Sequence, residues 1–298
     1  MSAAFQKEWA VVKKIAFVLL AATIVACGGG SRTLIQNKGS DTLLEVAQAL
    51  AENYKNVNPE VTVAVSGGGS GTGVSALING TVDLANSSRA LSDEEIELAR
   101  ANGGDPQQFT IGFDALAVYV HTSNPATQFT VAQLAEIYGE GGTTESWSQL
   151  GITVPGCGSD EIVRVSRQNN SGTYAYFREA VLGEDRDYKL GSRDMAGSKE
   201  VVDLVGHTPC AIGYSGLAYA TDEVKMPCLM ADESSPCVAP SIDTALDGTY
   251  PIARPLYMYT RGAPEGEVKA YLDWILGEEG QCIILEVGYA PVKMGSCG

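Results

Sequence analysis

Four short turns rich in serine and glycine hold the side chains of this sequence that are best suited to binding a small anion. They are residues 39–42, 66–73, 86–89 and 167–173. We expect each turn to lie directly before the start of a helix. The N-terminus of a helix presents unpaired N–H groups and the positive end of a dipole. Serine and threonine hydroxyls add further donors. Converging turns of this kind would therefore form a cage for an oxyanion.

The fourth turn carries the most specific pattern, R-x-x-x-S-G-T. Arg167 stands four residues before Ser171. Ser171, Gly172 and Thr173 would open a helix, and the guanidinium would add charge and forked geometry. Taken singly, each turn also fits the ordinary use of serine as a helix cap and of glycine as a turn residue. The second turn is not a Walker motif, because no lysine follows its final glycine. The four turns taken together, with Arg167 at the start of the fourth, favour an anion-binding site.

Helices and strands alternate around these turns. The apolar residues from Leu43 to Leu50 have helical spacing, whereas residues 61–65 are rich in β-branched side chains and end in glycines. The predicted helices span residues 40–54, 92–102, 131–138, 171–182 and 267–276, and the predicted strands include residues 61–65 and 115–120. Such alternation predicts an α/β fold.

The N-terminus has the pattern of a bacterial secretory signal. Three lysines precede an apolar run over residues 15–26, which is shorter than the ~20 residues needed to span a bilayer. The sequence Ile24-Val25-Ala26-Cys27 resembles a lipobox, in which the chain is cut before the cysteine and the sulfur is acylated. We predict a signal peptide over residues 1–26 and a lipidated, flexible tether over residues 27–32. An ordinary soluble signal with an incidental cysteine is the alternative.

The charge of the chain excludes some partners. The formal net charge is −16, and removal of residues 1–26, with three Lys and one Glu, would bring it to about −18. A chain this acidic lacks the basic face that nucleic-acid binding requires. A small anion is still compatible with it, because local N–H groups and one or two arginines decide affinity at contact distance, whereas net charge acts through screened fields.

Six cysteines follow Cys27, and an even number in an exported chain predicts disulfides. They are Cys157, Cys210, Cys228, Cys237, Cys282 and Cys297. Proximity in the sequence favours pairing the third with the fourth and the fifth with the sixth, which leaves Cys157 with Cys210. Zinc is the competing use of cysteine, but the chain has no C-x-x-C, and His121 and His207 lack metal-ligand spacing. We therefore predict no metal.

Several further segments share a likeness with one family. They are residues 111–118, residues 134–138 leading to Trp147, residues 211–217, residues 250–256, residues 280–281 and residues 287–291. With these segments and the four turns, the chain resembles the phosphate-binding proteins of ABC importers, the PstS family, over essentially its whole mature length. The R-x-x-x-S-G-T motif is the most specific part of the resemblance.

The resemblance implies a type II periplasmic-binding-protein fold, in which two hinge strands join two α/β lobes and the ligand lies between them. Residues 33–117 and 255–298 would build lobe one, and residues 118–254 would build lobe two. It also implies a monomer that binds inorganic phosphate in the periplasm or at the cell surface and delivers it to ABC permease subunits, without a cofactor and with the lipid at Cys27 as its membrane anchor. The residues predicted to bind phosphate are Ser40, Asp41, Thr42, Ser70, Gly71, Ser88, Arg89, Arg167, Ser171, Gly172 and Thr173.

The third turn departs from the family pattern. Family members often carry an aspartate there that accepts the proton of hydrogen phosphate and so rejects sulfate. Here Ser88 stands at that position, and Arg89 follows. A serine hydroxyl can accept a hydrogen bond but can also donate one, so it discriminates less sharply than a carboxylate. Asp41 could supply the acceptor, or it could serve only at the start of a helix.

Three other functions are compatible with parts of the sequence. The same turns could hold sulfate, molybdate or another tetrahedral oxyanion. The lobes could also sense phosphate without a transporter. An exported hydrolase would need Ser70 or Ser171 as nucleophile and His121 or His207 as base, and no G-x-S-x-G elbow supports it.

Overall fold

A computed structural model describes residues 33–183, 185–293 and 295–297 of the chain. The elements below belong to the compact unit of residues 34–298, apart from the first residue of the first strand. The predicted signal peptide, the lipobox with Cys27 and most of the tether lie outside the described residues. No helix within the described part of the chain is both long and apolar enough to cross a membrane.

The described residues contain twelve named strands and thirteen helical segments. The strands are β1 (Thr33–Gly39), β2 (Val61–Ser66), β3 (Leu84–Ser87), β4 (Gln107–His121), β5 (Gln128–Thr130), β6 (Val163–Arg167), β7 (Arg193–Met195), β8 (Ala211–Gly216), β9 (Val224–Lys225), β10 (Cys228–Met230), β11 (Ala253–Thr260) and β12 (Ala290–Pro291). The α-helices are α2 (Leu44–Val57), α3 (Ser70–Ile78), α4 (Asp93–Ala101), α5 (Val131–Tyr138), α6 (Gly172–Phe177), α7 (Ser198–Gly206), α8 (Ile242–Leu246), α9 (Gly266–Ile275) and α10 (Glu278–Val287). The short segments are the 3-10 helices η1 (Asp41–Leu43), η2 (Trp147–Leu150) and η4 (Leu217–Tyr219), and the π-helical turn η3 (Arg178–Leu182).

One long strand, β4, joins two halves of a continuous sheet whose main strand order is β2-β1-β3-β11-β4-β8-β6-β7. Up to Ala115, β4 pairs antiparallel with β11. From Leu116 to Val120 it pairs antiparallel with β8 instead. The run from Ala115 to Val120 is fully buried, which confirms the strand predicted from its uninterrupted apolar sequence.

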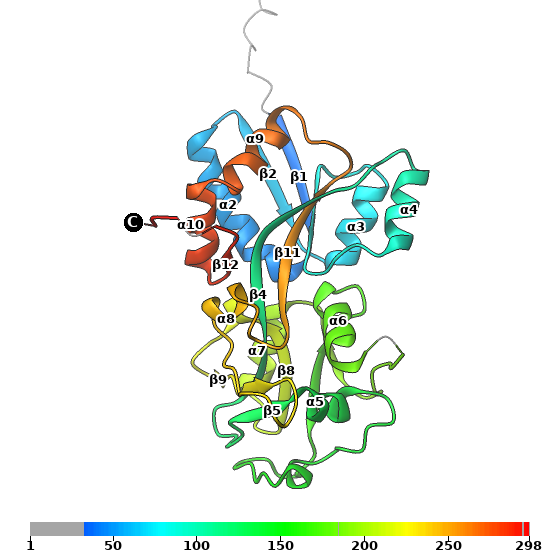
Figure 1. The fold of residues 1–298 in the computed structure, drawn as a ribbon, viewed down its shortest axis with the longest axis vertical. Helices are drawn as coiled ribbons and strands as arrows, with labels where there is room; N and C mark the ends of the chain where they lie inside the picture. Colours follow the sequence, from blue (N-terminus) through cyan, green and yellow to red (C-terminus); the bar gives the residue numbers. More distant parts are fainter. Residues whose placement is uncertain (1–32, 184, 294, 298) are drawn as a thin grey trace, which may run out of the picture. The chain divides into compact units, whose positions relative to one another are not determined.

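The change of partner along β4 separates two lobes (Figure 1). Lobe one holds β1, β2, β3, β11 and β12 with α2, α3, α4, α9 and α10, and lobe two holds β5 to β10 with α5 to α8. Lobe one packs two apolar clusters, one between the sheet and α2, α9 and α10, and one beneath α3 and α4. The other two apolar clusters lie mainly in lobe two, around β8 and α5 to α7. In Figure 1, β4 and β11 run between the two lobes.

Most predicted helices are confirmed, with small shifts at their ends. The helix at residues 131–138 is α5, and Thr130 and Gln133 close a capping box at its start. The helix predicted over residues 171–182 is α6 followed by the π-helical turn η3. One expectation is wrong: residues 86–87 end strand β3, and the turn that follows them does not open a helix, because α4 begins only after its own cap at Ser92.

The three predicted disulfides are confirmed. Cys157 is bonded to Cys210, Cys228 to Cys237, and Cys282 to Cys297. The first two lie within lobe two, and the third ties the end of the chain to α10 in lobe one. No disulfide joins the two lobes among the described residues.

Candidate anion-binding site

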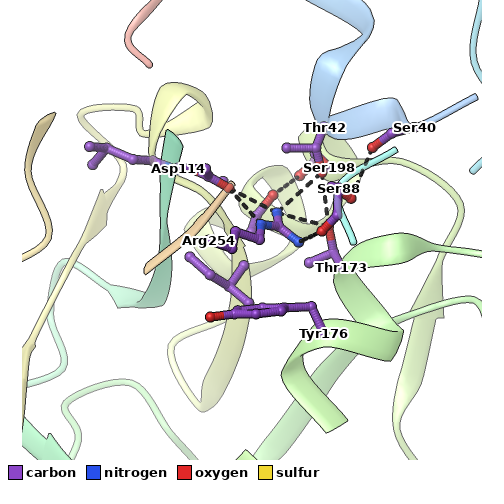
Figure 2. A network of polar contacts seen from close by, with 12 residues as sticks. Ser40, Thr42, Ser88, Asp114, Thr173, Tyr176, Ser198 and Arg254 are labelled. Carbon is purple, nitrogen blue, oxygen red and sulfur yellow. Dashed lines mark hydrogen bonds and ion pairs between the residues drawn. The ribbon is translucent and has the colours of Figure 1, made fainter. Parts of the chain in front are cut away.

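Three buried serines of lobe one meet at the carboxyl edge of its sheet. Strands β1 and β3 are parallel neighbours with Gly39 opposite Asn86, which brings Ser40 and Ser88 together just beyond their ends. The Ser40 hydroxyl donates to Ser88 Oγ at 3.0 Å (Figure 2). Ser70, the first residue of α3, accepts the Ser88 backbone N–H at 3.1 Å, and its hydroxyl lies 3.4 Å from Ser88 Oγ. Each hydroxyl can donate or accept, so the cluster can adapt to an oxyanion.

Lobe two meets this cluster with a glycine. Gly172 is the first residue of α6, and a Cβ atom added to it would lie 2.3 Å from Ser70 Oγ and 2.6 Å from Ser88 Oγ. Contacts that short do not occur, so only a residue without a side chain allows this approach. The backbone at the start of α6 therefore lies against the serine hydroxyls of the opposite lobe.

Further hydrogen bonds hold the lobes together around the cluster. The hydroxyls of Thr42 and Thr173 lie 2.8 Å apart across the lobe boundary. Gly71 N–H donates to the Asn170 carbonyl at 3.0 Å, and the Asn170 amide donates to the Gly68 carbonyl at 3.0 Å. The two lobes are thus in direct contact around the cluster.

Ser171 performs the ordinary capping role at the start of α6. Its Oγ accepts the backbone N–H groups of Thr173 at 3.1 Å and of Tyr174 at 3.4 Å. Its own hydroxyl proton remains available for donation. Of the three residues predicted to open this helix toward an anion, Gly172 and Thr173 contact lobe one most directly.

Arg167 ends strand β6 and is 99% buried, with 1% of the residue exposed. Its guanidinium donates to the Ala196 carbonyl at 2.7 Å, to Ser198 Oγ at 2.9 Å and to Asp41 Oδ2 at 3.2 Å. Burial lowers the pKa of Arg167, while the Asp41 carboxylate opposes this shift and the nearby charge of Arg254 adds to it. No hydrogen bond within the described residues joins this guanidinium to residues 171–173, so Arg167 reaches lobe one through Asp41.

Asp41 links three segments. One carboxylate oxygen accepts from Arg167, and the other accepts the Gly68 backbone N–H at 2.9 Å. Its backbone carbonyl accepts the Tyr219 hydroxyl at 2.6 Å. Both carboxylate oxygens are therefore engaged, and Asp41 is more than a residue at the start of a helix.

The structure does not bring Arg89 to the hydroxyl cluster. Its two terminal nitrogens donate to the Glu95 carboxylate at 2.7 and 2.6 Å, and one of them also donates to the Ala90 carbonyl. This contact anchors the loop after β3 to the start of α4. Glu95 stands six residues after Arg89 in the sequence, so this ion pair could have been predicted from the sequence.

A second buried arginine, Arg254, was not among the predicted site residues. It lies on β11 directly opposite Asp114 on β4, and Asp114 Oδ2 accepts from its Nε at 3.1 Å and its Nη2 at 2.8 Å. The same guanidinium reaches the Ser88 carbonyl and the hydroxyls of Thr42 and Thr173 (Figure 2). The signal in the sequence was its place in the segment 250–256, which contributed to the family resemblance.

Neither histidine pairs with a candidate nucleophile. His121 Nδ1 lies 2.8 Å from Ser123 Oγ, and His207 is exposed, with Nδ1 2.7 Å from the Asp203 carbonyl. A serine nucleophile needs a base within hydrogen-bond reach, and neither ring contacts Ser70 or Ser171 in the described part of the molecule. The described residues also contain no group of three His, Cys, Asp or Glu side chains that could hold a metal ion.

The fold and the site together define a class of protein, the two-lobed solute-binding proteins. Residues 26–279 match the model of the PBP superfamily domain. The members of this family are substrate-binding proteins rather than enzymes.

Two solved structures share the fold. One is a substrate-binding protein assigned to a phosphate ABC transporter of Clostridium perfringens, with bound phosphate, and the other is an ABC-type phosphate transport receptor from Vibrio cholerae. The first has a TM-score of 0.77 and 27% identity and covers 88% of this chain and 100% of its own. The second has a TM-score of 0.68 and 28% identity and covers 86% and 99%.

Sequence relatives narrow the class. The chain is 33% identical over 270 residues to the phosphate-binding protein PstS of Pseudomonas aeruginosa, covering 87% of this chain and 83% of the relative. It is 32% identical over 295 residues to protein SphX of Synechococcus elongatus, covering 95% and 85%. The chain therefore belongs to the PstS family of phosphate-binding proteins.

Proposed function

We propose that this chain binds inorganic phosphate between its lobes, outside the cytoplasm, and delivers it to the permease subunits of an ABC importer. One observation carries the proposal: three buried serine hydroxyls from three loops of lobe one face Gly172 at the start of α6 in lobe two. Hydroxyls and backbone N–H groups are the donors that a tetrahedral oxyanion needs. The family membership and the phosphate bound in the C. perfringens relative agree with it.

The arrangement also suggests how a protonated phosphate is accommodated. Both oxygens of Asp41 and both oxygens of Asp114 already accept hydrogen bonds from the protein. Ser88 Oγ already accepts from Ser40 at 3.0 Å, and a hydroxyl oxygen can accept a second hydrogen bond. We infer that Ser88 accepts the proton of hydrogen phosphate, with Ser40, Ser70, Gly172 and Thr173 as donors around it.

We also propose that the lobes divide as residues 33–117 with 255–298 and residues 118–254, and that they open about β4 and β11. The change of partner on β4 between Ala115 and Leu116, and the start of β11 at Ala253, support a hinge at this level. A ligand that contacts both lobes would favour the closed form, because it binds that form better.

The substitution Gly172→Ala tests the site. The added methyl group would overlap Ser70 and Ser88, and overpacking of about 1–3 kcal/mol in the closed form corresponds to about a 5- to 150-fold loss of phosphate affinity. Gly158→Ala is the matched control, because nothing lies within 4 Å of a Cβ at that exposed glycine. Calorimetric titration of both variants decides: equal affinities for phosphate would remove Gly172 and the serine cluster from the site.

We further propose that a lipid at Cys27 anchors the protein to the membrane, as the lipobox pattern suggests. Cys27→Ser should then move the expressed protein from the membrane fraction to the soluble fraction. Unchanged membrane partitioning of this variant would refute the anchor without bearing on phosphate binding.

A further inference from the structure

Arg254 and Asp114 form a buried ion pair at the level where the chain passes between the lobes. They face each other across the antiparallel strands β11 and β4. The exposed fraction of each side chain is 1% or less. Asp114 uses its second oxygen to accept the Leu217 backbone N–H at 3.0 Å. The pair therefore joins the neighbouring strands β4 and β11, and Asp114 also reaches the start of η4.

The rest of the guanidinium contacts both lobes at once. In lobe one it donates to the Ser88 carbonyl at 3.2 Å and to Thr42 Oγ1 at 3.4 Å. In lobe two it donates to Thr173 Oγ1 at 3.1 Å, and its Cζ lies 5.5 Å from the centre of the Tyr176 ring. Figure 2 shows Arg254 between these groups.

The two sets of contacts respond differently to lobe opening. The bonds to Asp114 and Ser88 lie within the hinge and lobe one, so they persist when α6 moves away. The contacts with Thr173 and Tyr176 require α6 to lie against β11, and the Tyr176 hydroxyl donates to the Ala253 carbonyl at 2.5 Å in the same arrangement. A group that makes more contacts in one state than in the other shifts the equilibrium toward the first.

We propose that Arg254 is a positioning residue that stabilises the closed form of the protein, and that it acts on ligand affinity through Thr42, Thr173 and the Ser88 carbonyl. This inference rests on the proposed function, since closure matters only if an oxyanion is enclosed. Asp114 holds the guanidinium in place. An arginine is required, because its planar fork reaches the carboxylate and both threonines together, whereas a lysine ammonium is a single compact charge.

Arg254→Lys is the variant that tests this role, because it keeps a positive charge opposite Asp114 and so protects the fold. We expect phosphate dissociation to accelerate by about 5- to 150-fold, the range typical of conformational coupling, with little change in the association rate. The phosphate-saturated variant should also remain partly open by small-angle scattering. The double variant Arg254→Gln/Asp114→Asn removes both charges and should show the same two effects.

Arg164→Gln is the control, because among the described residues the hydrogen bonds of the Arg164 guanidinium go to Glu145 and to the Leu190 carbonyl, both inside lobe two. Its dissociation rate and its degree of closure should match those of the parent. The proposal is overturned if Arg254→Lys releases phosphate as slowly as the parent. It is also overturned if the variant binds weakly yet closes as fully as the parent at saturation, since Arg254 would then be a direct ligand.

The design separates this inference from the proposed function. A parent protein that does not bind phosphate would refute the function. The scattering comparison of parent and Arg254→Lys would then use the anion that does close the parent, from a panel of sulfate, arsenate and molybdate, and would decide the role of Arg254 by the same two outcomes.

Discussion

Two buried arginines neighbour the same cluster, but their carboxylate partners are arranged differently. Arg167 of lobe two meets Asp41 of lobe one through a single contact of 3.2 Å, and Asp41 is 14% exposed. Arg254 meets Asp114 through two contacts on adjacent strands, and Asp114 is completely buried. The first pair can separate when the lobes part, because water can reach Asp41. The second pair has no such access. The first pair therefore fits the proposed boundary that opens, and the second fits the proposed hinge.

The largest expected effect is a loss of stability at the Arg254–Asp114 pair. Asp114→Ala leaves the Arg254 charge buried without its partner, which typically costs about 3–5 kcal/mol of unfolding free energy. Asp41→Ala should cost clearly less, because Arg167 keeps its bonds to Ala196 and Ser198 and the site is nearer to solvent. Urea denaturation of both variants measures the difference. Equal losses would show that the two pairs are not distinct.

The next effect concerns ligand affinity at the Arg167–Asp41 pair. Arg167→Ala removes the cation that neutralises Asp41 and leaves an uncompensated carboxylate near the bound anion. Loss of a charge-assisted partner in a closed cleft costs about 2–5 kcal/mol, which is roughly 30-fold to several thousand-fold in affinity. The circular dichroism spectrum should stay normal. If this variant bound phosphate as tightly as the parent, the role assigned to Arg167 would be wrong.

A smaller effect is expected at the start of α6. Ser171→Ala removes the cap that accepts two backbone N–H groups, and loss of such a cap costs about 1 kcal/mol of stability. Phosphate affinity should fall less than in Arg167→Ala, because the backbone of Gly172 remains in place. Thermal denaturation and titration of this variant test both statements, and an affinity loss as large as that of Arg167→Ala would contradict them.

The smallest effect belongs to a third arginine pair, Arg89–Glu95, which is partly exposed. Burial raises the pKa of Glu95, but hydrogen bonds from Arg89 and Ser92 outweigh it and lower the pKa below its ordinary value of 4.5. A lowered pKa in the folded state contributes stability above the ordinary value, and this contribution is lost as the pH falls through the folded value. Solvent screening limits it to about 1 kcal/mol or less.

Urea denaturation measures that contribution. The stability difference between the parent and Glu95→Gln should shrink as the pH falls below about 4.5 toward the lowered pKa of the folded state. A difference that grew toward acid would have the wrong sign.

The sequence predicted the local features of the molecule well. The cap at Ser171, the helix of residues 131–138 and the pairing of neighbouring cysteines depend on residues close together in the chain, and their patterns were visible. The serine turns were identified for the same reason. The sequence did not predict Arg254 as a site residue, because its position depends on strand register with Asp114, 140 residues away. It did not predict the contact of Thr42 with Thr173 either, since that contact forms only when two lobes meet.

Calorimetric titration of the purified chain, refolded to remove any carried-over ligand, tests the central claim most directly. Phosphate, arsenate and sulfate would be titrated separately at one pH near neutrality. The account predicts saturable binding of one phosphate per chain, with arsenate competing for the same site. Discrimination against sulfate should be weaker than a carboxylate would give, because the Ser88 hydroxyl can accept from hydrogen phosphate and can also donate to sulfate. The absence of phosphate binding by the folded, refolded chain would contradict the account as a whole.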